Sequence, residues 1–191
     1  MKKIIVLIVF VAGIATSGYS QFIKQGTIIG GGSFEFKSHK DGDSDNKRST
    51  LSLMPWAGYM VIDNFAAGAL LSVSTQTFKY SSGKDTDTGI LFGPVARYYL
   101  DNGLFAHGQF AFGSSKSKSE IDGSGTFETK FSTSELRIGA GYAARITDTI
   151  LFEPIVGFLS ESNKNTTSNV KNTESGFFIM AGFTIFFHST N

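Results

Sequence analysis

The chain has 191 residues, of which 41% are hydrophobic, 14% aromatic and 17% charged, and its formal net charge is +1. Such a balanced charge offers no electrostatic basis for binding nucleic acid. The absence of Cys excludes disulfides, thiolate metal sites, a Cys nucleophile and a lipidated N-terminal Cys. The chain contains 19 Phe but only 3 Pro, so it does not have a disordered composition, and its length fits one domain.

The first twenty residues have the pattern of a secretory signal peptide. Lys2 and Lys3 precede an apolar run, Ile4–Ile14, and the small residues Gly18 and Ser20 follow it. A membrane anchor is the alternative, but this run is shorter than the roughly 18 apolar residues that a spanning helix needs. We therefore predict a signal peptide over residues 1–20 and an exported domain over residues 21–191. Loss of the two lysines changes the formal charge from +1 to −1.

Beyond the signal peptide, large apolar residues alternate with small or polar ones. In residues 27–37 the even positions carry Ile28, Phe34 and Phe36, whereas the odd positions include Glu35 and Lys37. A period of two places these sets on opposite faces of a strand. The same pattern predicts eight strands, at Thr27–Lys37, Ser49–Val61, Ala67–Thr77, Ile90–Leu100, Leu104–Phe112, Glu135–Arg145, Ile150–Phe158 and Gly176–Phe187.

The predicted connections alternate in length. The long ones are rich in Ser, Thr, Gly, Asn and charged residues; they are His39–Arg48, Ser81–Asp87, Ser115–Ser132 and Glu161–Glu174. The short ones are turns, at Ile62–Phe65, Asp101–Gly103 and Ile146–Thr149. Transmembrane barrels have this arrangement, with short periplasmic turns and long external loops.

The chemistry of the two strand faces favours a membrane barrel over a soluble one. The narrow interior of an eight-stranded barrel suits the small and polar set, and lipid suits the bulky set. A soluble barrel would carry many Lys and Glu on its outer face, and these strands carry few. Outward aromatic residues near the short turns form a candidate interfacial girdle: Tyr59, Tyr98, Tyr142, Phe152 and Phe187. A lipocalin-like soluble barrel remains the alternative.

Three prolines fall inside predicted strands. Pro55, Pro94 and Pro154 each remove a hydrogen-bond donor from the ladder, and a closed barrel has no free edge to accommodate the loss. We expect a local bulge at each of them. Trp56 falls on the inward face by this count, unless a bulge at Pro55 changes the phase.

Several segments resemble the small outer-membrane β-barrel family of Gram-negative bacteria, of the OmpX and OmpA-barrel type, and especially its variant called the outer membrane protein beta-barrel domain. They are the glycine-rich Gly30–Gly32, the strand-turn-strand Met54–Gly68, the run Gly93–Tyr99 and the C-terminal strand. The resemblance covers Phe22–Phe187 and implies an all-β, eight-stranded, antiparallel up-and-down transmembrane β-barrel.

The resemblance also implies where the chain resides and which partners it meets. These are the cell outer membrane and its lipid, periplasmic chaperones and the barrel-insertion machinery, for a monomer with both termini in the periplasm. The insertion signal of such proteins corresponds to Gly182, Ile185 and Phe187. Met180, where a polar residue is common, and the tail His188–Asn191 depart from the family pattern.

Charged residues on the inward faces form two predicted layers. Arg97, His107, Arg145 and Glu153 belong to the layer near the short turns, and Glu35, Lys37, Glu135 and Arg137 to the layer near the long loops. An unpaired charge in a narrow lumen is costly, so we expect a structural network of ion pairs and hydrogen bonds that fills the barrel. A narrow gated path for ions or small solutes is the alternative.

No catalytic pattern stands out. The three His are His39 in a long loop, His107 inside the barrel and His188 in the tail, and none accompanies a recognisable nucleophile. We therefore expect a non-enzymatic protein without cofactor or metal, with an envelope-structural role or a role in surface-loop interactions. A lipid-modifying enzyme is the less favoured alternative. The loop Ser115–Ser132 resembles a hairpin with a glycine-rich tip whose edge could pair with a foreign strand.

Overall fold

The computed structural model describes residues 24–40, 47–80, 83–121 and 125–187. The side chains of residues 35–40 and of Arg48 are outside this description, although their backbone lies in strands. The predicted signal peptide and the tail His188–Asn191 also lie outside the described residues.

The described chain is built from antiparallel strands. They are β1 Ile28–Lys40, β2 Lys47–Ile62, β3 Phe65–Tyr80, β4 Gly83–Tyr99, β5 Leu104–Ile121, β6 Gly125–Tyr142, β7 Ala144–Arg145, β8 Ile150–Asn165 and β9 Lys171–Phe187. Within the described ranges, no helix has the length and apolar character needed to cross a membrane.

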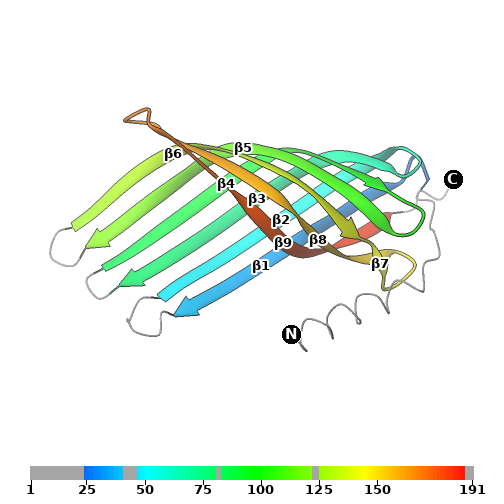
Figure 1. The fold of residues 1–191 in the computed structure, drawn as a ribbon, viewed down its shortest axis with the longest axis horizontal. Helices are drawn as coiled ribbons and strands as arrows, with labels where there is room; N and C mark the ends of the chain where they lie inside the picture. Colours follow the sequence, from blue (N-terminus) through cyan, green and yellow to red (C-terminus); the bar gives the residue numbers. More distant parts are fainter. Residues whose placement is uncertain (1–23, 41–46, 81–82, 122–124, 188–191) are drawn as a thin grey trace.

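The strands pair in a ring (Figure 1). Each strand from β1 to β5 pairs with the next along the chain, β6 pairs with β8, β8 with β9, and β9 returns to β1. The two-residue β7 continues β6 in the same register against β8, because Gly141 faces Ile155 and Ala144 faces Phe152. The ring therefore has eight strands, and the predicted fold class is confirmed.

The two strand faces differ as the alternation predicts. On β2, Leu51, Leu53 and Tyr59 are exposed, whereas Met54 and Trp56 are buried inside the ring. The predicted outward orientation of the bulky set is thus confirmed. The expectation that only small or polar groups point inward is incomplete, because a continuous apolar core also fills part of the lumen.

The prolines do not produce the expected bulges. The pairing of β2 with β3 passes from Leu53–Val73 to Trp56–Leu70 without a change of register around Pro55. The β4–β5 ladder near Pro94 and the β8 ladder near Pro154 show the same interruption with the register retained. Each proline lacks the N–H of one ladder bond, and the neighbouring pairs hold the register, so Trp56 keeps its inward phase.

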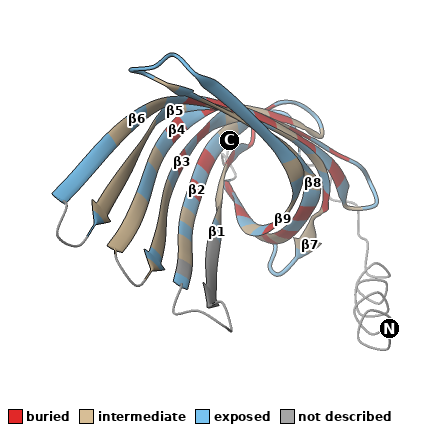
Figure 2. Cartoon of the chain, turned by 60° about the vertical axis from the view of Figure 1, so that its left-hand side comes forward, coloured by how far each residue is buried: buried red, intermediate tan, exposed pale blue. Residues whose placement is uncertain are grey.

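The strands extend further than the apolar alternation indicates. Most of the predicted loop Ser81–Asp87 belongs to β4, most of Ser115–Ser132 forms the β5–β6 hairpin, and most of Glu161–Glu174 forms the β8–β9 hairpin. In β5 the last residues alternate Ser with Lys or Glu, and a ladder in water tolerates this pattern because neither face needs an apolar neighbour. We call this end of the ring the hairpin end, and the opposite end the short-turn end. In Figure 2 the buried residues lie toward the short-turn end.

Candidate functional site

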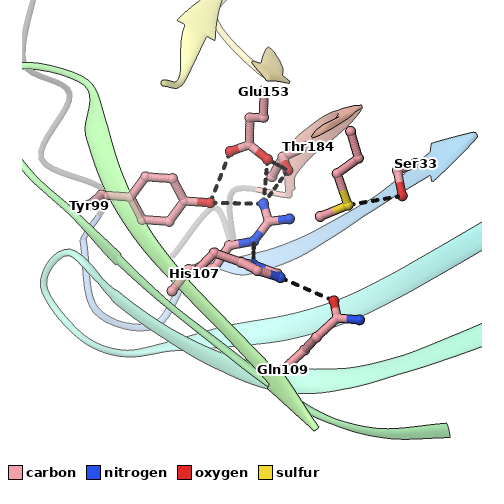
Figure 3. A network of polar contacts seen from close by, with 8 residues as sticks. Ser33, Tyr99, His107, Gln109, Glu153 and Thr184 are labelled. Atoms are coloured by element: carbon pink, nitrogen blue, oxygen red, sulfur yellow. Dashed lines mark hydrogen bonds and ion pairs between the residues drawn. The ribbon is translucent and has the colours of Figure 1, made fainter. Parts of the chain in front are cut away.

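A buried cluster of polar side chains crosses the lumen around Arg97 (Figure 3). The Arg97 guanidinium, 6% exposed, forms an ion pair with Glu153, which is 1% exposed. Its Nη1 also donates to the Thr184 hydroxyl at 3.2 Å. Glu153 accepts further hydrogen bonds from the Tyr99 hydroxyl at 3.0 Å and from the Thr184 hydroxyl at 2.5 Å. The carboxylate is therefore held by donors from β4 and β9 while it projects from β8.

Aromatic rings enclose the same guanidinium. The Arg97 Cζ lies 4.1 Å from the centroid of the Trp56 ring and 5.3 Å from that of Phe105. A guanidinium over an aromatic face is stabilised by the ring quadrupole, more strongly where water is excluded. The inward phase of Trp56 thus places the single Trp of the chain against the central cation.

The cluster continues toward the hairpin end through β5 and β6. Arg97 Nε donates to His107 Nδ1 at 3.3 Å, and His107 Nε2 lies 3.1 Å from Gln109 Oε1. Gln109 Nε2 donates to Glu135 at 3.1 Å. Arg137 then holds both oxygens of Glu135, at 2.8 and 2.7 Å. Five predicted residues from the two layers, Arg97, His107, Glu135, Arg137 and Glu153, therefore belong to one connected chain. We call it the lumen network, and its members are Arg97, Tyr99, His107, Gln109, Glu135, Arg137, Glu153 and Thr184.

The structure places the predicted lumen residues in three different ways. Arg97, His107, Glu135, Arg137 and Glu153 meet in the lumen network. Glu35 and Lys37 lie in β1, with side chains outside the described residues.

The prediction that Arg145 belongs to the buried layer near the short turns is wrong. The Arg145 side chain is 39% exposed and pairs with Asp148 in the turn before β8. Arg145 stands at the short-turn rim, where the turn that follows it offers a local carboxylate, so it is not buried with the network.

Three members of the lumen network, Tyr99, Gln109 and Thr184, are not among the lumen residues that the sequence predicts. The available signal was spacing: Tyr99 follows Arg97 by two residues, so a strand places both on one face. The partnership of Thr184 with Glu153 joins β9 to β8 and has no such local signal.

Apolar side chains close the lumen below the lumen network. The buried side chains at the short-turn end, which we call the apolar floor, are Ile29, Met60, Phe105, Leu151 and Phe186. A small cavity of about 20 Å³ remains among Trp56, Arg97, His107 and Glu153 and their neighbours. Such a volume holds about one water molecule. Among the described residues, every buried side-chain nitrogen or oxygen has a partner, so the network is satisfied without a ligand.

Above the network the lumen widens into a cavity of about 890 Å³, which we call the cup. Hydroxyl and amide groups dominate its wall, including Thr50, Ser72, Gln76, Ser115 and Asn163. The Glu135–Arg137 pair lies in its lining, at the boundary with the network.

Charged residues on the β5–β6 hairpin form two ion pairs, and one of these residues, Lys116, also lines the cup. Lys116 pairs with Glu128 at 2.7 Å and Lys118 with Glu120 at 2.6 Å. Hydrogen bonds from these ammonium groups lower the pKa of Glu128 and Glu120, and the bond to Glu120 raises the pKa of Lys118. The first residues of β6, from Gly125, pair with β5 alone, since the ladder to β8 begins at Phe131.

The described residues contain no group of three or more His, Cys, Asp or Glu side chains placed to hold a metal ion. His107 has both ring nitrogens engaged, by Arg97 and by Gln109. A general base needs a free nitrogen within reach of a nucleophile.

Solved structures share this architecture. The translocator domain of the autotransporter NalP from Neisseria meningitidis superposes with a TM-score of 0.53 at 14% identity, covering 88% of this chain and 64% of that domain. The β domain of the Bordetella autotransporter BrkA gives 0.51 at 16% identity, covering 84% of this chain and 69% of that one. Neisserial surface protein A gives 0.45 at 16% identity, covering 83% and 96%. At these identities the likeness concerns the fold alone, and the chain spans less than two thirds of the NalP domain. No curated protein sequence matches the chain.

The sequence itself matches a family over most of its length. The family described as the outer membrane protein beta-barrel domain matches residues 48–191, which include every described strand from β3 to β9 and nearly all of β2. Together with the antiparallel ring of strands and its outward apolar side chains, this match places the protein in the cell outer membrane. The chain belongs to the outer membrane protein beta-barrel domain family.

Proposed function

We propose that this outer-membrane barrel is a non-conducting, non-enzymatic monomer that has an envelope-structural role and presents its hairpins to the exterior. The observation that carries the proposal is the filled lumen. The lumen network crosses the ring, and the apolar floor lies between it and the short-turn end. Eight strands leave an interior just wide enough for side chains, so little room remains for a hydrated ion.

The state of His107 supports the non-enzymatic part of the proposal. Arg97 donates to one ring nitrogen, which makes the other the donor to Gln109. The ring therefore serves as a relay of hydrogen bonds and has no nitrogen left to activate a hydroxyl nucleophile.

Single-channel recording in planar bilayers tests the closed lumen. The wild type should give no conductance steps beside an open porin measured in the same bilayers. Arg97→Met and Glu153→Gln should also stay closed, because neither substitution removes the apolar floor. Conductance steps in the wild type would contradict the proposal, and steps in either variant alone would favour a gated path through the network.

The β5–β6 hairpin is the candidate surface for external interactions. Its Gly125–Thr129 edge pairs only with β5, and the charged groups on the hairpin keep it hydrated. Charged edge strands resist non-specific pairing, so a partner must supply complementary charges as well as a strand. Deletion of residues 116–130 should leave heat-modifiable folding intact and reduce binding to surface partners. Equal binding by the deletion variant and the parent would exclude an adhesive role for this hairpin.

We also propose that β9 is the strand read by the barrel-insertion machinery after periplasmic chaperones deliver the chain. Ile185 and Phe187 are exposed on the outer face of β9, and Gly182 packs against β1 where an added Cβ would meet the Gly32 carbonyl oxygen at 2.6 Å. Phe187→Ala should slow assembly into the membrane in cells while purified protein still refolds in detergent. Unchanged assembly kinetics would remove Phe187 from the signal.

A further inference from the structure

The junction between β1 and β9, which we call the seam, is paired over only part of its length. Its ladder runs from Ile28–Phe187 to Ser33–Gly182 and then stops. From Lys171 to Ala181 the described pairing of β9 is with β8, and from Phe34 onward that of β1 is with β2. By contrast, β6 and β8 pair from Phe131 to Gly141. Figure 1 shows β9 turning away from β1 toward the hairpin end.

The exposure of side chains on β9 identifies the side that lacks a neighbour. Phe177 is 94% exposed, whereas Phe158, its direct partner on β8, is 46% exposed. Ile179 is 77% exposed, compared with 56% for its partner Val156. Phe158 and Val156 have a neighbouring strand on each side, β6 and β9, whereas Phe177 and Ile179 pair with β8 alone. The greater exposure of the β9 side chains therefore arises on the side toward β1. The seam is therefore open beside Phe177 and Ile179.

This opening lies within the apolar belt of the barrel. Phe177 and Ile179 continue the outward row that ends at Phe187 on the same strand. Backbone groups without a strand partner are tolerated at membrane depth only where they line protein or a water-filled cavity. The cup provides that cavity, because its wall includes β2 residues on one side of β1 and Asn172 and Glu174 of β9 on the other.

The lining of the cup determines which ligand it suits. Its described lining contains four carboxylates, of Asp87, Glu135, Glu161 and Glu174, and two cations, of Lys116 and Arg137. This excess of negative charge disfavours an anionic head group. Abundant hydroxyl and amide groups, together with carboxylate acceptors, suit a head group that both donates and accepts hydrogen bonds, namely one bearing several hydroxyls.

We propose that the seam admits the apolar chain of an amphiphile from the bilayer, with its uncharged, hydroxyl-rich head in the cup. The apolar chain of the amphiphile lies against Phe177 and Ile179 at the open side of β9. On the inner face of the same stretch, Phe178 lies beneath the Arg137 guanidinium, with 5.5 Å from Cζ to the ring centroid. Beside the opening, the inner wall therefore changes from the apolar ring of Phe178 to the charged group of Arg137, which lines the cup.

Disulfide trapping tests the opening itself, and the chain has no native Cys to interfere. Ile28→Cys with Phe187→Cys places two outward thiols on a paired position of the seam. Phe36→Cys with Ile179→Cys occupies the equivalent position further along the same register. The first pair should cross-link readily under mild oxidation, and the second should remain reduced. Equal cross-linking of both pairs would show a closed seam and overturn the proposal.

Photolabelling tests the ligand. Protein in phosphatidylcholine nanodiscs is irradiated with a decyl glucoside that carries a diazirine in its chain, and adducts are mapped by peptide mass spectrometry. Labelling should concentrate on residues 176–181 of β9. It should exceed the labelling by the matched decanoate probe by about fivefold, the effect of roughly one hydrogen bond. Labelling spread evenly over the outer surface, or as strong with the decanoate probe, would overturn the proposal.

A matched pair of variants completes the experiment. Phe177→Ala should reduce labelling of β9 severalfold, whereas Phe110→Ala, on the outer face of β5 between two neighbouring strands, should leave it unchanged. Equal effects of the two substitutions would reduce the proposed site to ordinary lipid contact. Photolabelling does not depend on ion conduction, so its result is independent of whether the lumen is closed to ions.

Discussion

Glu153 is the residue whose substitution should destabilise the barrel most. Its carboxylate, 1% exposed, accepts hydrogen bonds from Arg97, Tyr99 and Thr184. Glu153→Gln keeps the shape of the side chain but leaves the buried Arg97 guanidinium without its counter-charge. Removing one partner of a buried ion pair costs about 3–5 kcal/mol, because the other charge stays buried and uncompensated. We expect the free energy of unfolding to fall by about that amount.

Unfolding by urea in phospholipid vesicles measures this change. The heat-modifiable gel band reports the folded fraction, and the fluorescence of Trp56, whose ring lies 4.1 Å from Arg97, reports the network directly. Glu161→Gln is the matched control: Glu161 also points inward from β8 but lies in the cup, where it accepts a hydrogen bond from Asn163. That substitution should cost less than about 1 kcal/mol, as for other partly hydrated pairs.

A double-mutant cycle separates the charge pair from the loss of packing. Arg97→Met combined with Glu153→Gln removes both charges, so the double variant should be more stable than the sum of the single losses predicts, by about 1 kcal/mol or more. The reasoning is refuted if Glu153→Gln costs no more than Glu161→Gln, or if the two single losses simply add.

Three further outcomes follow from other parts of the structure. Gly93→Ala should destabilise the barrel by about 1–3 kcal/mol, because its Cβ would lie 1.9 Å from a carbonyl oxygen of β5, whereas Gly108→Ala, with nothing within 4 Å, should be tolerated in the same urea assay. The lowered pKa of Glu128 means that its bond to Lys116 stabilises the β5–β6 hairpin above the ordinary Glu pKa of about 4.3 and is lost as pH falls through the lowered value. The protection of hairpin amides from exchange, relative to the intrinsic rate at each pH, should therefore fall in acid in the wild type but not in Glu128→Gln. Ile138→Arg on the lipid face should cost up to about 2–4 kcal/mol in vesicles, and a negligible cost would refute the outward orientation of that face.

The membrane-level part of each strand could be predicted because its signal is local. Alternation with period two specifies a strand, and the side on which Phe and Leu recur specifies the face that meets lipid. The hairpin ends have no such signal. The residues after Gly113 in β5 alternate Ser with Lys or Glu, a pattern shared by loops and by hydrated ladders, so only pairing with β4 and β6 shows that they are strands.

The candidate site shows the same division. Arg97 and Glu153 could be expected to pair because an isolated charge in a narrow lumen is too costly. Arg145 has the same inward phase, yet it pairs with Asp148, because the adjacent turn supplies a carboxylate that period-two reasoning does not consider.

The sequence by itself determined the membrane-level part of the strands and the face that meets lipid, since both depend on residues within a few positions of one another. The tertiary structure alone decided how the lumen is filled and where the ring stays open. The contacts of Thr184 with Glu153 and the end of the β1–β9 ladder at Ser33 join residues 31 and 149 positions apart. Such contacts depend on ring closure and strand tilt, which no local pattern encodes.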